Sequence, residues 1–531
     1  MSTVGEQLVA ALKARGVEVV FGIPGVHTVE LYRGLARSGI RHVTPRHEQG
    51  AGFMADGYAR ASGKPGVAFV ITGPGLTNAL TPMAQARADS VPMLVLSGVN
   101  ASGTLGQGMG HLHELPDQHG LARSVALVSE HVARPQDLNS ALDRVFASFT
   151  TGRPGPTHIQ VPLDVAGAEG VAPSAPVAAP TPKVSDEEIA EAARKLTAAK
   201  RVVILAGGGA SKAAPDVQDL AERLDAPVVQ TVNARGILYS HDLSVPASPS
   251  LQAVRDLIEA ADIVLALGTE LGPTDYDMYA TGTMALMPEL IRVDLCAAQL
   301  ARHAAALALH GAVGPFVRSL LAVLPDAAKS AGGAMRAAAA RAAAWEEIGA
   351  EYRGQVEIVN AMRDALPGAL MVGDSAQPIY AANLYYDHDR AGGWFNAATG
   401  YGALGYAIPA AIGAAIAKPG TRVICIVGDG GAQFSLPEIM AAVDEKLPIT
   451  FVVWNNHGYR EIAMAMQDVD VPVVGCDPTP PDFALTAASF GIPHQAVGPD
   501  PAEIAQALRK APADGPSMIE IAAPVFVPAK D

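Results

Sequence analysis

Short apolar runs alternate with stretches of helical spacing along most of the chain. In the first third, Val4–Arg15 has the spacing of an amphipathic helix and ends at Gly16. The apolar runs of this third are Val17–Phe21, Val67–Thr72, Met93–Ser97 and Thr157–Val161. Short buried strands separated by helices are typical of a parallel sheet with helices on both faces.

The same alternation returns in the middle and in the last third of the chain. The middle runs are Val202–Leu205, Val228–Thr231, Ile263–Leu267 and Ile291–Asp294. The last runs are Leu370–Val372, Arg422–Val427, Ile449–Trp454 and Met518–Ile521. We therefore predict an α/β protein with three doubly wound parallel-sheet domains.

Changes in composition suggest where these domains begin and end. Residues 165–184 are rich in Ala, Pro, Gly and Val, which is typical of a linker, and Ser185-Asp-Glu-Glu then signals the start of a helix. Asp326–Ala344 is rich in Ala and helix-prone, which suggests a tether. The predicted domains are residues 1–165, 185–325 and 350–525.

Composition excludes several classes of function. The chain has 531 residues, 49% of them hydrophobic and 17% charged, and a net charge of -15, so nothing suggests binding to nucleic acid or to an anionic membrane. Its three cysteines are far apart and predict neither a disulfide framework nor a zinc site. The start of the chain does not resemble a signal peptide, and Ala403–Ala417 is better explained as a buried helix than as a membrane span. We expect a cytoplasmic protein.

Polar side chains follow two of the apolar runs in the last third. Gly428-Asp429-Gly430-Gly431 follows one strand, and Asn455-Asn456 follows the next. Ligands bind at the carboxyl ends of strands in such sheets, so both tips can face one ligand. Carboxylate and amide oxygens suit Mg²⁺, and the glycines let backbone N–H groups approach a diphosphate. Either motif alone could be an ordinary turn, but the pair is much more specific.

These motifs resemble those of thiamine-diphosphate enzymes of the acetolactate synthase and pyruvate decarboxylase superfamily. The resemblance covers roughly residues 3–525 and implies pyrimidine-binding, central and diphosphate-binding domains. It implies that Asp429, the Asn456 side chain and the Gly458 carbonyl bind Mg²⁺. Gly373-Asp-Ser375-Ala-Gln377 looks like the loop that holds the diphosphate from the other side.

A second motif, early in the chain, carries the chemistry. Glu48 lies in His47-Glu-x-x-Ala-x-x-x-Ala-Asp-Gly-Tyr-Ala-Arg60, which is similar to the stretch that carries the family's cofactor-activating glutamate. Thiamine must lose the proton on its thiazolium C2, and its own 4′-amino group can take that proton as an imine. A carboxylate bonded to N1′ favours this tautomer, and burial should raise the pKa of that carboxyl group.

Three further segments resemble family loops. Pro24 lies in the early loop, and Thr72, Pro74 and Asn78 match the loop that lies against the pyrimidine. In Tyr401-Gly402-Ala-Leu404, the Gly402 carbonyl would accept from the 4′-amino group and Leu404 would wedge between the rings, although core packing is an alternative for Leu404. The resemblance implies a homodimer or homotetramer with active sites at the subunit interface.

The loop at Gly110–Gln118 bears on the reaction. His113 stands where acetolactate synthases carry a glutamine, and His111 is close by. Decarboxylases of simple 2-oxo acids need a proton donor after CO₂ leaves, and histidine suits that role near neutral pH. We therefore predict catalytic roles for His113 and His111, although either could merely hydrogen-bond the loop.

The loop of His113 and two further segments bear on the substrate. Three segments, His111–Gln118, Thr269–Tyr279 and Tyr385–Asn396, resemble 5-guanidino-2-oxopentanoate decarboxylases of arginine catabolism. The guanidinium group of this substrate would pair with a carboxylate. The candidates are Glu114, Asp275, Asp277 and Glu461. Each of them could equally be a surface acid. We expect decarboxylation of that 2-oxo acid to the aldehyde. The alternative is an acetolactate synthase-like or benzoin-type carboligase. Gly207-Gly-Gly209 is retained, but we see no flavin-specific pattern beyond it and expect no FAD.

Overall fold

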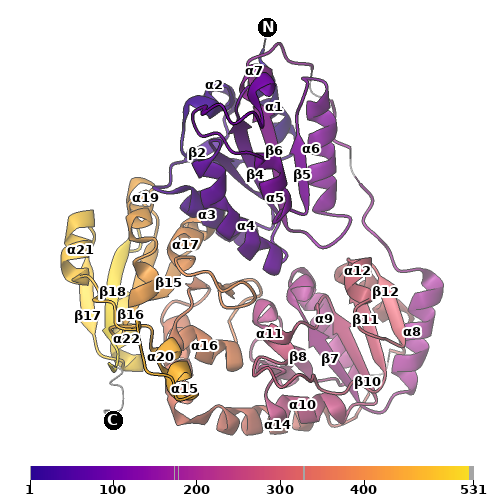
Figure 1. Cartoon of the computed structure of the whole chain (residues 1–531). Coiled ribbons are helices and arrows are strands. Elements are labelled where there is room, and N and C mark those ends of the chain that lie inside the picture. Colours follow the sequence, from indigo (N-terminus) through magenta and orange to yellow (C-terminus); the bar gives the residue numbers. More distant parts are fainter. Residues whose placement is uncertain (1, 173, 178, 327–328, 526–531) are drawn as a thin grey trace.

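A computed structural model describes residues 2–172, 174–177, 179–326 and 329–525. Figure 1 shows three α/β units, the first at the top, the central one at lower right and the third at lower left. Within these residues each unit is built on one six-stranded parallel sheet. The predicted α/β class and the three parallel sheets are confirmed.

The first sheet has the strand order β2-β1-β3-β4-β6-β5. Its strands are β1 (Val19–Gly22), β2 (Arg41–Val43), β3 (Gly66–Val70), β4 (Met93–Val99), β5 (Val128–His131) and β6 (Pro156–Pro162). Its helices are α1 (Val4–Ala14), η1 (Val26–Thr28), α2 (Val29–Ser38), α3 (Glu48–Ser62), α4 (Pro74–Ala88), η2 (Ser102–Thr104), α5 (Gln118–Arg123), α6 (Asp137–Ser148) and α7 (Leu163–Ala166).

The third sheet repeats this order as β14-β13-β15-β16-β18-β17. Its strands are β13 (Leu370–Gly373), β14 (Trp394–Asn396), β15 (Val423–Gly428), β16 (Ile449–Asn455), β17 (His494–Val497) and β18 (Ser517–Ala522). Its helices are α15 (Gly349–Ala365), α16 (Gln377–Leu384), α17 (Ala407–Ala417), α18 (Asp429–Ala432), η5 (Leu436–Glu438), α19 (Ile439–Asp444), α20 (Arg460–Gln467), α21 (Phe483–Phe490) and α22 (Pro501–Lys510). The first and third units therefore share one topology.

The central sheet has a different order, β12-β11-β10-β7-β8-β9, which is that of dinucleotide-binding folds. Its strands are β7 (Val202–Ala206), β8 (Val228–Gln230), β9 (Ser244–Val245), β10 (Ile263–Leu267), β11 (Leu290–Asp294) and β12 (Leu307–His310). Its helices are α8 (Asp186–Ala198), η3 (Gly208–Ala213), α9 (Ala214–Leu224), η4 (Val232–Ala234), α10 (Gln252–Glu259), α11 (Pro273–Tyr276), α12 (Ala297–Leu300), α13 (Val313–Val323) and α14 (Gly333–Glu347).

The helices α8 and α14 lie near the predicted domain boundaries, where the sequence showed a capping signal and an Ala-rich stretch. Ser185 Oγ accepts from the Glu188 N–H, and the Glu188 carboxylate accepts from the Ser185 N–H, so the predicted capping box opens α8. From Gly333 onward the Ala-rich stretch forms α14, whose Ala337, Ala340 and Ala344 are buried in the core of the central unit, whereas residues 327 and 328 of that stretch lie outside the described residues. This helix therefore packs as part of the central unit, whereas composition had suggested a tether.

The first and third units share one hydrophobic core. Helices α3 and α17 lie against each other, and their small residues allow close approach, since a Cβ on Gly57 or Gly413 would collide with the facing backbone. The contact also carries a buried polar cluster, in which Tyr406 Oη and Arg60 Nε each donate to Asp56 Oδ1 over 2.6 Å. This packing fixes the predicted pyrimidine and diphosphate regions of one chain relative to each other.

Candidate active site

The tips of two neighbouring strands hold the side chains predicted to bind a metal. Gly428 ends β15 and pairs with Trp454 of β16, so Asp429 and Asn456 leave the sheet close together. The Asn456 N–H donates to Asp429 Oδ1 over 3.3 Å. Asp429 Oδ2 and Asn456 Oδ1 are buried, and neither has a hydrogen-bond partner among the described residues. Unpaired buried oxygens are costly, and such oxygens are the ligands that Mg²⁺ prefers.

Gln377 orients the Asn456 side chain. Its Oε1 accepts from Asn456 Nδ2 over 3.0 Å and from Trp454 Nε1 over 3.1 Å. The nitrogen end of the Asn456 amide is therefore occupied, and the oxygen end is left for a cation. Gln377 Nε2 in turn donates to Glu461 Oε1 over 3.0 Å.

Most of the glycines near Asp429 and Asn456 are packed so closely against their neighbours that a side chain would not fit. A Cβ on Gly430 would collide with the Tyr459 ring, and one on Gly458 would collide with the Cys476 carbonyl. A Cβ on Gly431 would lie 2.9 Å from Asp374 Oδ1, whereas one on Gly428 would meet only ordinary contacts. The chain is thus tightly folded around Asp429 and Asn456.

The donor set fits a hard cation. In the described part of the chain, no group of three or more His, Cys, Asp or Glu side chains is arranged to hold a metal ion. Mg²⁺ can also be held by a mixture of carboxylate, amide and backbone oxygens. Asp429, Asn456 and the Gly458 carbonyl offer such a combination.

Asp374 joins this region to the loop that carries Gly402 and Leu404, and sequence reasoning gave it no role. Its Oδ1 accepts from the Ser375 N–H over 2.9 Å and its Oδ2 from the Ala407 N–H, the first residue of α17, over 3.0 Å. Burial raises the pKa of Asp374 to about 6. Gly402, with φ of 74°, is exposed, and Leu404 is half-buried.

Glu48 is the first residue of α3, and the structure brings it to Asn78 of α4. Asn78 Nδ2 donates to Glu48 Oε2 over 3.0 Å, so two residues of the predicted pyrimidine site lie together. The backbone N–H groups of Arg46 and His47 donate to Glu438 on η5. Burial raises the pKa of Glu438 to about 7. Glu438 therefore anchors the start of α3 on the third unit, a role with no signal in the sequence.

The loops around Thr72 and Pro24 also meet. Gln118 Oε1 accepts from Thr72 Oγ1 over 2.6 Å and from the Gly73 N–H over 2.9 Å, just before Pro74. Gln118 Nε2 lies within hydrogen-bond distance of Ser97, Gly98 and Gln160. Gly25, beside Pro24, lies against Ile71. The buried Gln118 was not singled out from the sequence, because it reaches the loop only through the fold.

The two predicted histidines have different surroundings. His111 is exposed, and its N–H donates to Glu114 Oε2 over 2.9 Å. His113 is half-buried, and its ring lies against His27, with ring centroids 5.4 Å apart. The structure thus gives His113 a histidine neighbour from another loop.

The four guanidinium candidates also differ. Glu114 accepts from three backbone N–H groups of its own loop, and Asp277 accepts from Thr281, Gly282 and Arg255. Asp275 is held by the Val232 N–H, and burial raises its pKa to about 6. Glu461, on α20, is the candidate that lies next to the metal region, through Gln377.

The glycine run of the central unit packs against backbone. A Cβ on Gly207 would collide with the Gly268 carbonyl, and one on Gly209 would lie 3.0 Å from the Gly268 Cα. Close strand packing therefore accounts for both glycines. The expectation that FAD is absent stays a prediction. None of the described helices has the length and apolar character needed to cross a membrane.

The chain thus has three parallel sheets, of which the first and third share one topology, and the third carries a buried carboxylate–amide oxygen pair at two strand tips. Residues 2–121, 189–320 and 374–521 match the models described as the N-terminal TPP binding, central and C-terminal TPP binding domains of thiamine pyrophosphate enzymes. The chain belongs to this family.

Individual relatives agree with this membership. A probable 2-ketoarginine decarboxylase, AruI, of Pseudomonas aeruginosa is 42% identical over 501 residues, which cover 92% of this chain and 88% of that protein. The acetolactate synthase isozyme 1 large subunit of Escherichia coli is 30% identical, covering 86% and 82%. The acetolactate synthase large subunit of Lactococcus lactis is 30% identical, covering 98% and 92%. The chain is thus an enzyme that uses thiamine diphosphate.

Proposed function

We propose that this enzyme catalyses the non-oxidative decarboxylation of 5-guanidino-2-oxopentanoate (2-ketoarginine) to the corresponding aldehyde and CO₂, with Mg²⁺ and thiamine diphosphate. The observation that carries the proposal is the 42% identity, along 92% of the chain, to a probable 2-ketoarginine decarboxylase. We assign the pyrimidine-binding domain to residues 1–165, the central domain to residues 185–325 and the diphosphate-binding domain to residues 350–525.

The metal and the diphosphate are assigned to the tips of β15 and β16. Asp429, Asn456 and the Gly458 carbonyl would hold Mg²⁺, because Asp429 Oδ2 and Asn456 Oδ1 lack partners. Backbone at Gly428, Gly430 and Gly431, with Ser375 and Gln377, would face the diphosphate. When bound, thiamine diphosphate supplies a carbon nucleophile and an electron sink.

The pyrimidine is assigned to the loops around Glu48. Glu48 would share a proton with N1′, and its contact with Asn78 holds the carboxylate in position. Pro24, Thr72 and Pro74 would lie against the ring. Gly402 and Leu404 would contact the pyrimidine from the diphosphate domain.

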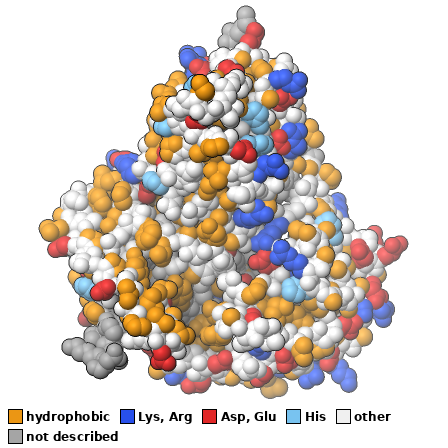
Figure 2. Space-filling model, viewed as in Figure 1, with side chains coloured by type: hydrophobic (Ala, Val, Ile, Leu, Met, Phe, Trp, Pro, Cys, Tyr) orange, Lys and Arg blue, Asp and Glu red, His pale blue; other side chains and the backbone are white. Residues whose placement is uncertain are grey.

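A second copy of the chain is proposed to complete each active site. Glu48 is hydrogen-bonded to Asn78 within the first unit, whereas Asn456 is hydrogen-bonded to Asp429 and Gln377 within the third unit. The surface at and after α20 is also apolar, with large exposed side chains at Ile462, Val469, Val471 and Val474. Figure 2 shows hydrophobic side chains gathered over this part of the third unit. Such patches often mark protein contacts, and we assign this one to a homodimer or homotetramer.

The guanidinium is assigned to Glu461. This carboxylate is half-buried beside Gln377, whereas the other three candidate acids accept from backbone N–H groups. Two phenols lie close to it: burial, and then the Glu461 charge, raise the pKa of Tyr352 to about 12 and act in the same direction on Tyr380. A carboxylate beside aromatic rings suits a planar cation.

The test compares kcat/KM for 5-guanidino-2-oxopentanoate with that for 2-oxohexanoate, a neutral acid of similar length. We expect the wild-type enzyme to prefer the cationic acid and Glu461→Gln to lose roughly 10- to 100-fold of that preference, because a hydrogen bond to a charged group contributes about 1.5–3 kcal/mol. Glu461→Asp, which keeps the charge, should retain part of it. No turnover of the guanidino acid by the wild-type enzyme would refute the proposal.

A second candidate function is carboligation, which the 30% identity to acetolactate synthases favours. It predicts a C–C bonded product from pyruvate. Good acetolactate formation, together with no aldehyde from the guanidino acid, would select this alternative.

A further inference from the structure

Two histidines from different loops meet beside the loop that carries Thr72 and Pro74. The ring centroids of His27 and His113 lie 5.4 Å apart, with 39° between the ring planes. His27 lies in η1, which follows β1, and His113 lies in the long loop after β4. The sequence had suggested His111 as the companion of His113, and it gave His27 no role.

Backbone packing fixes both histidines. A Cβ on Gly98, at the end of β4, would lie 2.9 Å from the Cβ of His27. A Cβ on Gly73 would lie 2.5 Å from the His113 carbonyl oxygen and 3.0 Å from its Cβ. Gly73 stands between Thr72 and Pro74, so His113 lies directly against the proposed cofactor loop.

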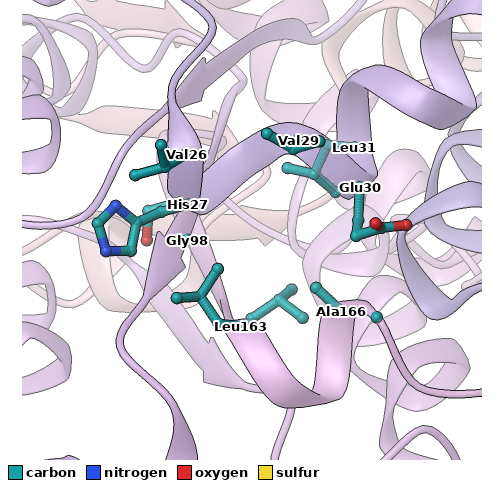
Figure 3. Close-up of a pocket in the computed structure, with 11 residues that line it drawn as sticks. Val26, His27, Val29, Glu30, Leu31, Gly98, Leu163 and Ala166 are labelled. Atoms are coloured by element: carbon teal, nitrogen blue, oxygen red, sulfur yellow. The ribbon is translucent and has the colours of Figure 1, made fainter.

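Each of the two rings carries a buried nitrogen that the packing of the described residues around it leaves unsatisfied. His27 is only 4% exposed, and the Nδ1 atoms of His27 and His113 are both buried without a hydrogen-bond partner in the described part of the chain. Figure 3 shows the His27 ring pointing away from the other side chains that line a cavity of about 190 Å³. Val26, Leu163 and Ala166 line this cavity, together with the polar residues Glu30 and Ser97.

The backbone of His113 is strained as well. Its φ of 60° lies in the left-handed region, which few residues other than glycine adopt, although Asn, Asp and His do so more often than the rest. Residues held in this way cluster at functional sites, where the surrounding structure compensates for the strain.

Few other charged groups face the pair. Burial, and then the neighbouring His113, lower the pKa of His27. Glu30 of α2 also lines the cavity, but its carboxylate accepts from Arg33. Glu114, on the loop of His113, is taken up by backbone N–H groups, including that of His111. His113 is thus the charged neighbour that acts on the pKa of His27.

We propose that His27 and His113 form a two-histidine unit, in which His27 positions the His113 ring and shares the proton that His113 delivers to the product carbon. The inference rests on the proposed decarboxylation and names a positioning residue for it. In that reaction the bond from the carbonyl carbon to the carboxylate breaks, CO₂ leaves, and the electron pair stays on the carbon. A C–H bond forms there with the proton from His113, and water restores the proton to the pair.

A double-mutant cycle tests whether His27 acts through His113. His27→Phe keeps a ring of similar size, and His113→Asn tolerates the left-handed backbone. We expect His27→Phe to lower kcat on the order of tenfold or more with little change in KM. We expect the double variant to be no slower than His113→Asn, because the two residues work as a unit. Additive losses, or a kcat of His27→Phe within about twofold of wild type, would overturn the inference.

A second measurement does not depend on activity. The pKa of His27 can be followed by NMR in protein with ¹³C-labelled histidine, and its signal is the one lost in His27→Phe. Replacing His113 by Asn should raise the pKa of His27, because His113 lowers it. An unchanged His27 titration contradicts the coupling.

The two measurements separate this inference from the proposed function. If the wild-type enzyme does not decarboxylate 2-oxo acids, the proposed function fails, while the NMR coupling still reports on the pair. If the wild-type enzyme is active and the cycle is additive, only the two-histidine unit fails.

Discussion

Replacing Asp429 by Asn should have opposite effects on the protein without and with its cofactor. Asp429 is 1% exposed, and its Oδ2 has no partner among the described residues. Without a cation, this carboxylate is a buried group left unsatisfied, which costs about 1–3 kcal/mol. Asn has the same shape and removes the charge, but its amide also needs a partner, so Asp429→Asn should stabilise the cofactor-free protein by about 1 kcal/mol, the lower end of this range. A change of 1 kcal/mol shifts the melting temperature of a unit this size by roughly 2–4 °C.

With cofactor and metal bound, the wild-type protein should instead be more stable than Asp429→Asn. At a concentration one hundred times Kd, cofactor and metal stabilise the wild-type protein by about 2.7 kcal/mol. If the variant binds them a hundredfold more weakly, the same concentration equals its Kd and the gain falls to about 0.4 kcal/mol.

The assay is thermal unfolding of both proteins with and without Mg²⁺ and thiamine diphosphate. Asp219→Asn, an exposed acid on α9 of the central unit, is the matched control and should change neither melting temperature. An Asp429→Asn protein that melts below wild type without cofactor, yet keeps the full cofactor shift, would refute the assignment of Asp429 to the metal.

Three further predictions follow from single residues. Glu48→Gln should leave thiamine diphosphate binding within a few-fold, measured by fluorescence titration, and lower turnover by about 100-fold or more; unchanged turnover argues against an N1′ role. Gly458→Ala should weaken Mg²⁺-dependent cofactor binding, because its Cβ would collide with the Cys476 carbonyl; normal binding would show that the loop can adjust. Burial raises the pKa of Glu438 from 4.5 to about 7, so its ionisation opposes folding. The free energy of unfolding of the cofactor-free protein should therefore fall by roughly 3 kcal/mol between pH 4.5 and 7 and level off above pH 7. In thermal unfolding at a series of pH values, Glu438→Gln should flatten this decline. An equal decline in the variant would exclude Glu438 as its source.

The interior of each sheet could be predicted from the sequence, and the edges could not. Every apolar run chosen as a strand lies inside a sheet, next to partners on both sides. The strands that were missed are the six at the sheet edges. Edge strands pair on one side only, and here they are two to four residues long, as in β9 and β2, so they carry little hydrophobic signal.

Some residues of the candidate site could likewise be predicted from the sequence, and others could not. Asp429 and Asn456 could be placed together because each directly follows an interior strand, and adjacent parallel strands end at the same edge. His27 and Gln118 could not, because each reaches the site from a loop or helix whose position depends on the whole first unit. Spacing along the chain identifies residues at strand ends, and only the fold identifies residues that meet across loops.

The most direct test of the central claim is the stoichiometry of the wild-type reaction. Purified enzyme with Mg²⁺, thiamine diphosphate and 5-guanidino-2-oxopentanoate is followed for substrate consumed, CO₂ released, aldehyde formed and any C–C bonded product. Decarboxylation predicts one CO₂ and one aldehyde for each molecule of substrate, and no product when the cofactor is left out. One CO₂ for every two molecules of 2-oxo acid, with a C–C bonded product in place of the aldehyde, would contradict it.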